Sequence, residues 1–294
     1  METIEDLVSV IIPTYNRSGL IVRSAQSILN QTYKNLELII VDDGSTDNTE
    51  DVVKKLNDSR VIYIKQTNQG ACAARNNGID HARGQFIAFQ DSDDVWHEDK
   101  LERQIKTLKE TGADVVICNI IYHYSKNMYM EVADRHFSKG FIKNTVVPLG
   151  ICPQMLLCKS EIFKDNRFDI EMPRYQDFEL LLRLQKKYTF YYDNVALVDY
   201  YIQQDSISKD GKKLLKAWDI ILNKHTDFFE CYKNNLDLLA RITMGEAFLS
   251  KDTNTKKQLV RVAFRFKNNL RMKVYYIKLK LWFSLKNKVS DNNN

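Results

Sequence analysis

Four apolar runs alternate with helical patterns over the first hundred residues, and this alternation most restricts the possible folds. The apolar runs cover residues 8–12, 36–41, 60–64 and 86–89, and the helical patterns between them cover 20–29, 48–56 and 71–82. A helix between successive strands favours right-handed crossovers and a mainly parallel sheet. The sequence therefore predicts an α/β fold in which helices flank a mainly parallel sheet.

A polar cluster follows each apolar run. The clusters cover residues 13–17, 42–43, 68–75 and 91–93. In sheets of this kind ligands bind at the carboxyl ends of the strands. We therefore expect the four clusters to converge on one site.

The fourth cluster contains two carboxylates that are one residue apart. Asp91 and Asp93 would share a face of an extended chain, because alternate residues of a strand point the same way. Two neighbouring carboxylates repel unless a cation lies between them, and Mg²⁺ or Mn²⁺ that also bridges a diphosphate fits that position. Arg17 and Arg75 can meet phosphate oxygens bidentately. The alternative for an isolated D-x-D triplet is a solvated acidic turn.

The same segments resemble family 2 glycosyltransferases of the GT-A fold. The resemblance is carried by residues 9–17, 40–47, 73–78 and 89–94, in order and at family-like spacing. It implies an inverting transferase that uses a nucleotide sugar, UDP-linked, and a divalent cation, Mn²⁺ or Mg²⁺. It also implies a role in bacterial cell-surface glycan or polysaccharide synthesis.

The resemblance assigns roles to individual residues. Asp93 would be the principal metal ligand, and Asp91 would address ribose or metal. Asp43 would be the nucleotide-binding acid, with Asp42 a neighbour or turn former. Asp94 matches the trailing acid of the motif, and its alternative role is to favour the amino terminus of a helix at 98–109. The implied nucleotide-binding residues are Pro13, Thr14, Tyr15, Arg17, Asp43, Asn68, Arg75, Asp91 and Ser92.

Inversion at an anomeric carbon also requires a general base that takes the proton of the acceptor hydroxyl. The segment 174–184 resembles the acid-containing motif of the family, and it places Asp177 at the start of a helix. The helix amino terminus would keep this carboxylate ionised. A simple capping role is the alternative for Asp177, and Glu179 is the second candidate for the base.

Two family features are absent. Many members carry a histidine after the strand that corresponds to residues 195–201, whereas this chain has Gln203, Gln204 and Asp205 there. The third metal ligand is therefore open. The Gln-x-x-Arg-Trp motif of processive relatives and any long apolar span are also missing, which favours a single addition of sugar.

The 294 residues are expected to form three parts. Residues 1–100 would bind the nucleotide sugar, 101–210 would form the acceptor-binding and catalytic half, and 211–294 would form a helical carboxyl-terminal appendage. The five cysteines contain no C-x-x-C pair and the acidic amino terminus contains no secretory signal, so we predict a cytoplasmic protein. The five histidines are scattered and predict no zinc site, and His97 is taken as a helix-start or surface residue.

The carboxyl-terminal region is basic and amphipathic. Residues 253–290 contain eleven Lys and Arg and no Asp or Glu. One apolar helical stripe is predicted, formed by Ala263, Phe266, Leu270, Val274, Ile277, Leu281 and Leu285. This stripe could lie on an anionic membrane or contact a lipid-linked glycan acceptor, or it could pack on the catalytic domain and a second subunit as a homodimer. Nucleic acid is not an expected partner.

Two other functional classes fit part of the pattern. A nucleotidyltransferase that makes nucleotide sugars would share the sheet and the metal, but its first loop is normally rich in glycine, and residues 13–17 are not. A non-catalytic module that binds nucleotides or glycans would need no positioned base. Released diphosphate, released pyrophosphate or neither distinguishes the three classes.

Overall fold

The computed structural model describes residues 3–125, 128–131, 138–143, 150–202, 211–231, 236–250, 252–268 and 272–281. The chain divides into two compact units. The first contains residues 1–143, 151–170 and 176–206, and the second contains 144–150, 171–175 and 207–294. Each unit is described by itself. The three-part division at residues 100 and 210 stays a prediction.

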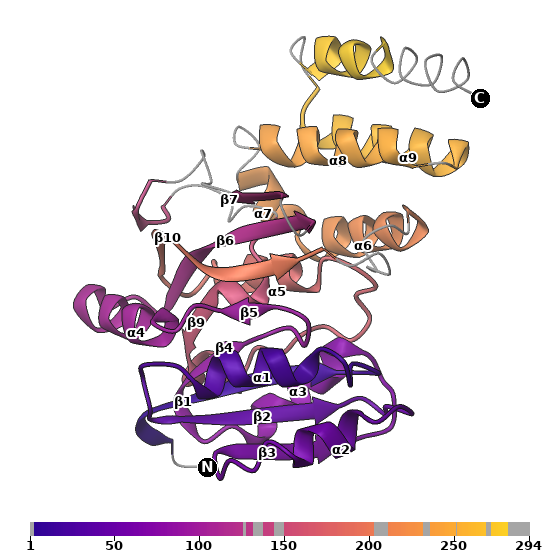
Figure 1. Ribbon diagram of the computed structural model, residues 1–294. Helices are drawn as coiled ribbons and strands as arrows, with labels where there is room; N and C mark the ends of the chain where they lie inside the picture. Colours follow the sequence, from indigo (N-terminus) through magenta and orange to yellow (C-terminus); the bar gives the residue numbers. More distant parts are fainter. Residues whose placement is uncertain are drawn as a thin grey trace. The chain divides into compact units, whose positions relative to one another are not determined.

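The first unit is built on one sheet, in which the described strands follow the order β3-β2-β1-β4-β9-β6-β10-β5 (Figure 1). Two short strands extend it, since β7 pairs with β6 and β8 pairs with β10. The strands are β1 (Ile4–Thr14), β2 (Leu36–Asp42), β3 (Val61–Lys65), β4 (Gly84–Phe89), β5 (Val95–Trp96), β6 (Val115–Ser125), β7 (Met128–Glu131), β8 (Gly140–Phe141), β9 (Leu156–Lys159) and β10 (Phe190–Tyr201).

The amino-terminal half of the sheet has the predicted parallel arrangement. β3, β2, β1 and β4 pair in parallel, and the chain returns between them through α1 (Ile21–Leu29), α2 (Thr49–Lys54) and α3 (Ala71–His81). Every residue of β2 is buried, as expected for a strand covered on both faces. The α/β class and the helix-flanked sheet are therefore confirmed.

The carboxyl-terminal half of the sheet is mixed, and its central strand was not predicted. β9 runs antiparallel to both neighbours, β4 and β6, and so lies between the two parallel groups of strands. It has only four residues, and short 3₁₀ turns, Pro153–Met155 and Ser160–Lys164, flank it. β6 and β10 pair in parallel, and β5 adds antiparallel to β10.

Two helices complete the described part of the first unit. α4 (Lys100–Thr111) packs on β6, β9 and β10. α5 (Gln176–Leu184) follows a left-handed residue, Tyr175, at φ 59°, and begins with Asp177 and Glu179 in its first turn. Its leucines are buried, as the sequence pattern predicts.

The second unit is helical. It contains α6 (Gly211–Lys224), α7 (Thr226–Cys231), α8 (Asp237–Leu249), α9 (Thr253–Phe266) and a further helix at 272–281. Trp218 is fully buried, and its ring packs edge-on against Tyr175 and Phe266, with centroid distances of 5.2 and 4.9 Å. Within the residues that the structure describes, no helix has the length and apolar character needed to cross a bilayer.

The prediction of one continuous apolar stripe in the tail is wrong. Ala263 and Phe266 are buried, whereas Val274, Ile277 and Leu281 are 42%, 53% and 60% exposed. The division occurs because α9 ends at Phe266 and residue 267 is extended, so the next helix begins with a new orientation. The predicted stripe residues 270 and 285 lie outside the described residues.

Candidate functional site

The first two polar clusters interlock at the carboxyl edge of the sheet. The backbone N–H of Asp43 donates to the carbonyl of Thr14 at 2.8 Å. Asn16, at a positive φ of 50°, donates its N–H to Ser45 Oγ at 2.8 Å and accepts from the Thr46 N–H at 2.8 Å. These bonds bring the loops after β1 and β2 together.

The Asp43 carboxylate connects this pair of loops to the third cluster. It is buried, and it accepts from Gln66 Nε2 at 2.8 Å, from the Gln69 N–H at 2.9 Å and from the Gly70 N–H at 2.7 Å. Asp42 stabilises the turn after β2 and the neighbouring strand β3, since its carboxylate accepts from the Ser45 N–H at 2.7 Å and from Tyr63 Oη at 2.5 Å. Asp43 therefore shapes the loop that leads into α3.

Arg75 on α3 connects the third cluster to the fourth and to α5. Its Nη2 donates to Asp91 Oδ1 at 2.8 Å, and its Nη1 donates to Gln176 Oε1 at 3.5 Å. Its guanidinium lies 5.4 Å from the centroid of the Phe168 ring. Because Gln176 begins α5, this one buried arginine brings the acidic loop and the start of α5, where Asp177 lies, to the same place.

The acidic loop does not have the extended form assumed from the sequence. β4 ends at Phe89, and residues 92 and 93 form a turn in which the Asp94 N–H meets the Asp91 carbonyl at 3.5 Å. The argument that Asp91 and Asp93 share a face of a strand is therefore wrong. A turn, rather than strand alternation, places the two carboxylates.

Asp94 has a role that the sequence argument missed. It is 1% exposed, and its carboxylate accepts from the Tyr201 N–H at 2.7 Å and from Gln154 Nε2 at 2.8 Å. The same Gln154 accepts from the Asp91 N–H at 3.3 Å. The expectation that Asp94 favours the next helix is wrong, because α4 begins at Lys100 with Asp99 as its N-cap. No local pattern marks Gln154, whose partners lie about 60 residues earlier.

The acidic loop fits a divalent cation that is shared with a substrate. Burial, together with the charges of Asp91 and Asp93, raises the pKa of Asp94 to about 8. The negative charges of Asp91 and Asp93 attract a cation, and Mg²⁺ bound with substrate phosphates needs only one or two protein carboxylates. In the described part of the chain, no group of three or more His, Cys, Asp or Glu could hold a metal ion. Residues 203–205, where the third ligand was sought, lie outside the described residues.

Asp177 lies half-buried in the first turn of α5. Its Oδ1 accepts from the Phe178 N–H at 2.8 Å. Burial raises its pKa above the ordinary value, although the Phe178 N–H and the positive charge of Arg75 act in the opposite direction. Glu179 is buried and bound by the Arg183 guanidinium at 2.9 Å, and a carboxylate held by a cation is the weaker base.

The other predicted residues differ in exposure. Pro13, Thr14 and Ser92 are buried, whereas Tyr15 is 47% exposed and Asn68 is exposed. Among the residues that the structure places, Thr14 Oγ1, Arg75 Nε and both amide atoms of Gln90 are buried and make no hydrogen bond. Each such atom costs about 1–3 kcal/mol unless a ligand or water satisfies it.

The sequence profile of the glycosyl transferase family 2 matches residues 9–176. The chain belongs to this family. The matched region contains all four polar clusters. Asp177, the proposed base, lies one residue beyond the end of the match.

Curated glycosyltransferases are similar to the chain in sequence. It is 33% identical over 221 residues to WfgD of Escherichia coli, a UDP-Glc:alpha-D-GlcNAc-diphosphoundecaprenol beta-1,3-glucosyltransferase, with 73% of this chain and 85% of WfgD covered. The chain spans from 24% to 86% of the length of eight curated relatives, and less than half the length of four of them.

Two solved structures share the fold. S. aureus TarS 1–349 in complex with UDP-GlcNAc has a TM-score of 0.61 at 19% identity, with 94% of this chain and 80% of that chain covered. The mannosyltransferase PcManGT from Pyrobaculum calidifontis, in complex with GDP-Man and Mn²⁺, has a TM-score of 0.62 at 16% identity, with 94% and 83% covered. The GT-A fold predicted from the sequence is confirmed.

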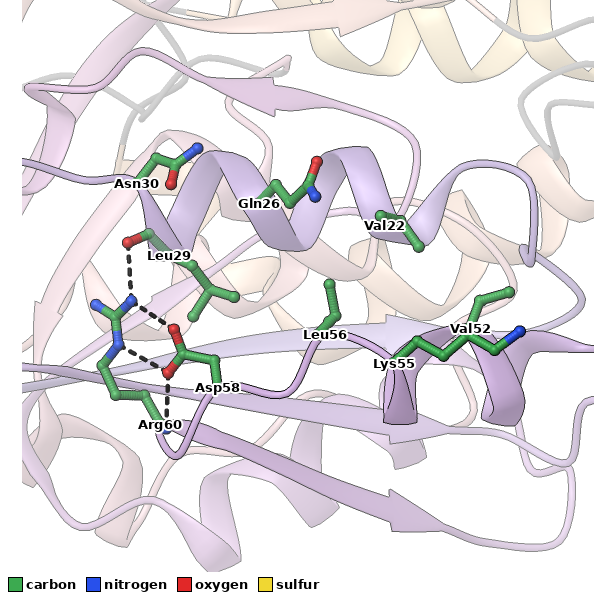
Figure 2. Close-up of a pocket in the computed structure, with 9 residues that line it drawn as sticks. All are labelled: Val22, Gln26, Leu29, Asn30, Val52, Lys55, Leu56, Asp58 and Arg60. Carbon is green, nitrogen blue, oxygen red and sulfur yellow. Dashed lines mark hydrogen bonds and ion pairs between the residues drawn. The ribbon is translucent and has the colours of Figure 1, made fainter.

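A pocket in the first unit is separate from this site. Figure 2 shows it between α1 and α2, where Arg60 donates to Asp58 and to the Leu29 carbonyl. None of the predicted site residues lines it. The candidate site is therefore defined by the interlocked loops at the carboxyl edge of the sheet.

Proposed function

We propose that the chain transfers a sugar from a nucleoside-diphosphate sugar, UDP-linked, to an acceptor hydroxyl with inversion and by single addition. The observation that carries this proposal is Arg75, which bonds the acidic loop at Asp91 and the start of α5 beside Asp177. A diphosphate-binding acidic loop and a base across from it are the two parts that an in-line displacement needs. Family 2 membership supports the class of reaction.

In this reaction Asp177 takes the proton of the acceptor hydroxyl as the oxygen attacks the anomeric carbon. The bond between that carbon and the diphosphate oxygen breaks, and the nucleoside diphosphate leaves with the bonding electrons. A divalent cation, Mn²⁺ or Mg²⁺, held by Asp93 and Asp91 would neutralise the charge on the diphosphate. The raised pKa of Asp177 makes this carboxylate a stronger base than an exposed aspartate.

The nucleotide would occupy the loops after β1 and β2 together with α3. The unpaired buried donors Thr14 Oγ1 and Arg75 Nε lie on two of the predicted nucleotide-binding residues and would gain partners there. Asp43 already accepts three hydrogen bonds, and a carboxylate has about four acceptor sites, so one remains for a uracil or ribose donor. Tyr15, Arg17, Asn68 and Ser92 complete the proposed contacts.

The acceptor is proposed to be a glycan or a lipid-linked glycan in bacterial cell-surface polysaccharide synthesis. The name of WfgD describes a UDP-linked donor and a diphosphoundecaprenol-linked acceptor, and this relative supports the same substrate classes here. The proposed location is cytoplasmic, at the inner face of the plasma membrane.

Incubation with a panel of nucleotide sugars tests the function. We expect a UDP-sugar, Mn²⁺ and a glycan acceptor to release one UDP for each sugar added. Release of pyrophosphate from a sugar phosphate and a nucleoside triphosphate would identify a nucleotidyltransferase instead. Binding of UDP with neither product would identify a non-catalytic module.

We further propose that helix 272–281 contacts an anionic membrane surface. Its inner side packs within the second unit, where the Tyr276 ring lies 5.6 Å from Phe248 and 6.1 Å from Phe264. Val274, Ile277 and Leu281 are exposed at spacings of three and four residues and so form one face. Lys273, Lys278 and Lys280 are exposed in the same helix and suit a negatively charged surface.

The double substitution Ile277→Ser, Leu281→Ser should weaken binding to anionic vesicles by about tenfold or more, because each side chain contributes about 1–2 kcal/mol when buried. Co-sedimentation with phosphatidylglycerol and phosphatidylcholine vesicles at low and high salt measures the effect. Leu249→Ser, which changes a leucine that is 72% exposed on α8, is the matched control. Full-length protein that ignores anionic vesicles at low salt would contradict the proposal. A change in oligomeric state, measured by light scattering, would instead assign the face to a homodimer.

A further inference from the structure

Two consecutive residues of α1 hold the acidic loop by its backbone. Ser24 Oγ donates to the Asp91 carbonyl at 2.8 Å, and Arg23 Nη2 donates to the Asp93 carbonyl at 2.5 Å. Ser24 is fully buried, whereas Arg23 is exposed. Both aspartates of the proposed cation site are thus fixed through their main chains, and neither bond uses a carboxylate oxygen.

Arg23 is itself held by the end of β10. Its guanidinium lies 4.2 Å from the centroid of the Tyr201 ring, a distance that gives a favourable cation–π contact. The Tyr201 N–H donates to the Asp94 carboxylate at 2.7 Å, so one residue contacts both Arg23 and the acidic loop. Two contacts therefore hold the Arg23 guanidinium: a hydrogen bond to the Asp93 carbonyl and a cation–π contact with the Tyr201 ring.

Further contacts hold the Tyr201 ring. It stacks on His123 with a centroid distance of 4.7 Å and an interplanar angle of 15°. His123 Nε2 lies 2.7 Å from one oxygen of Asp199, and His97 Nε2 lies 3.2 Å from the other. His97, expected to be a surface or helix-start residue, therefore belongs to this group, which spans β6, β10 and the chain after β5.

We propose that Arg23 and Ser24 are positioning residues that fix the separation and direction of the Asp91 and Asp93 carboxylates before the cation and diphosphate bind. This rests on the proposed function for the identity of the ligand. A carbonyl held by a hydrogen bond fixes the peptide plane and thereby the direction in which the preceding Cα presents its side chain. Groups that orient metal ligands from behind commonly contribute ten- to a hundredfold to metal affinity.

Arg23→Met tests this with little risk to folding, because the side chain is exposed and the substitution keeps an unbranched stem. We expect amide hydrogen exchange in the peptide 90–96 of the free protein to be about tenfold faster. We expect the Kd for Mn²⁺ in the presence of UDP, measured by calorimetry, to rise about tenfold. The affinity for UDP alone and kcat at saturating Mn²⁺ should change less than threefold, a split that a general loss of structure would not give.

Two further variants complete the design. Ser24→Ala should also speed hydrogen exchange in the peptide 90–96. A thermal midpoint equal to that of the wild type would show that the faster exchange comes from a looser loop and not from global unfolding. Arg103→Met is the matched control, because Arg103 is a 53% exposed arginine on α4 that pairs with Asp99 outside the site. It should leave exchange in 90–96 and Mn²⁺ affinity unchanged.

Unchanged exchange in 90–96 in both Arg23→Met and Ser24→Ala would overturn the proposal. Wild-type protein that binds no Mn²⁺ with UDP would remove the cation from the proposed function, and hydrogen exchange would still decide whether Arg23 holds the loop. An equal rise of Kd in Arg103→Met would also overturn it, because the loss of affinity would then not depend on the contact between Arg23 and the Asp93 carbonyl.

Discussion

Asp177→Asn should lower kcat by about 10²-fold or more while the affinity for UDP stays at the wild-type level. Asparagine keeps the shape of the side chain and still accepts the Phe178 N–H that binds Asp177 Oδ1 at 2.8 Å, but it cannot take a proton. Steady-state rates at saturating donor and calorimetry with UDP measure the two effects separately.

The pH dependence gives an independent check on Asp177. A general base works only when ionised, and burial raises the pKa of this carboxyl above its ordinary value. Activity of the wild-type enzyme should therefore fall as the pH decreases through a value above about 3.9, the pKa of an exposed aspartate. Glu179→Gln is the control: it should reduce stability, because Arg183 loses the charge of its ion-pair partner, but spare kcat. Normal turnover by Asp177→Asn, with loss of turnover in Glu179→Gln, would reverse the assignment.

Asp93→Ala should reduce kcat/KM by about 10²-fold or more and raise the Mn²⁺ concentration needed for half-maximal activity. The loss follows because a cation stabilises the departing diphosphate by several kcal/mol, and about 3 kcal/mol corresponds to a factor of 10² in rate. Rates measured across a Mn²⁺ titration, with and without EDTA, give both quantities.

Asp99→Ala provides the comparison for Asp93→Ala. Asp99 is an aspartate six residues further along the chain that forms an ion pair with Arg103 at the start of α4. Its removal should leave the Mn²⁺ dependence unchanged. Undiminished activity in EDTA, together with wild-type rates for Asp93→Ala, would show that the acidic loop binds no catalytic cation.

The sequence predicted the amino-terminal half of the fold because most residues of β1, β2 and β4 are buried. Buried strands of this kind appear in a sequence as continuous apolar runs, and the helices between them show apolar residues every three or four positions. β9 escaped prediction because a strand of four residues, three of them buried, is too short to show a period, and its partners β4 and β6 are chosen by tertiary packing. The apolar stripe of the tail was drawn through the break at residue 267, which no glycine or proline marks.

The site residues that directly follow strands could be predicted from the sequence. The site residues that contact one another over long sequence separations could not. The clusters after β1 to β4 were found from their positions alone. Gln154 and Tyr201 were not, because they reach Asp94 over sequence separations of 60 and 107 residues. The turn at residues 92–93 was also missed, since an acidic triplet after a strand gives no sign of where the strand ends.

The large sequence separations of the Asp94 contacts determine when these contacts can form during protein synthesis. Synthesis proceeds from the amino terminus, and the contiguous β1–β4 region can begin to assemble while the rest of the chain is still on the ribosome. By then every proposed nucleotide-binding residue has emerged, but Gln154 and Tyr201 have not. Until the chain has passed residue 201, the buried carboxyl of Asp94 lacks at least one of its two partners and Arg23 has no ring to lie on. The nascent chain thus holds the complete sequence of the acidic loop, and its contacts with Ser24 and Arg75, before it holds the contacts that fix Asp94.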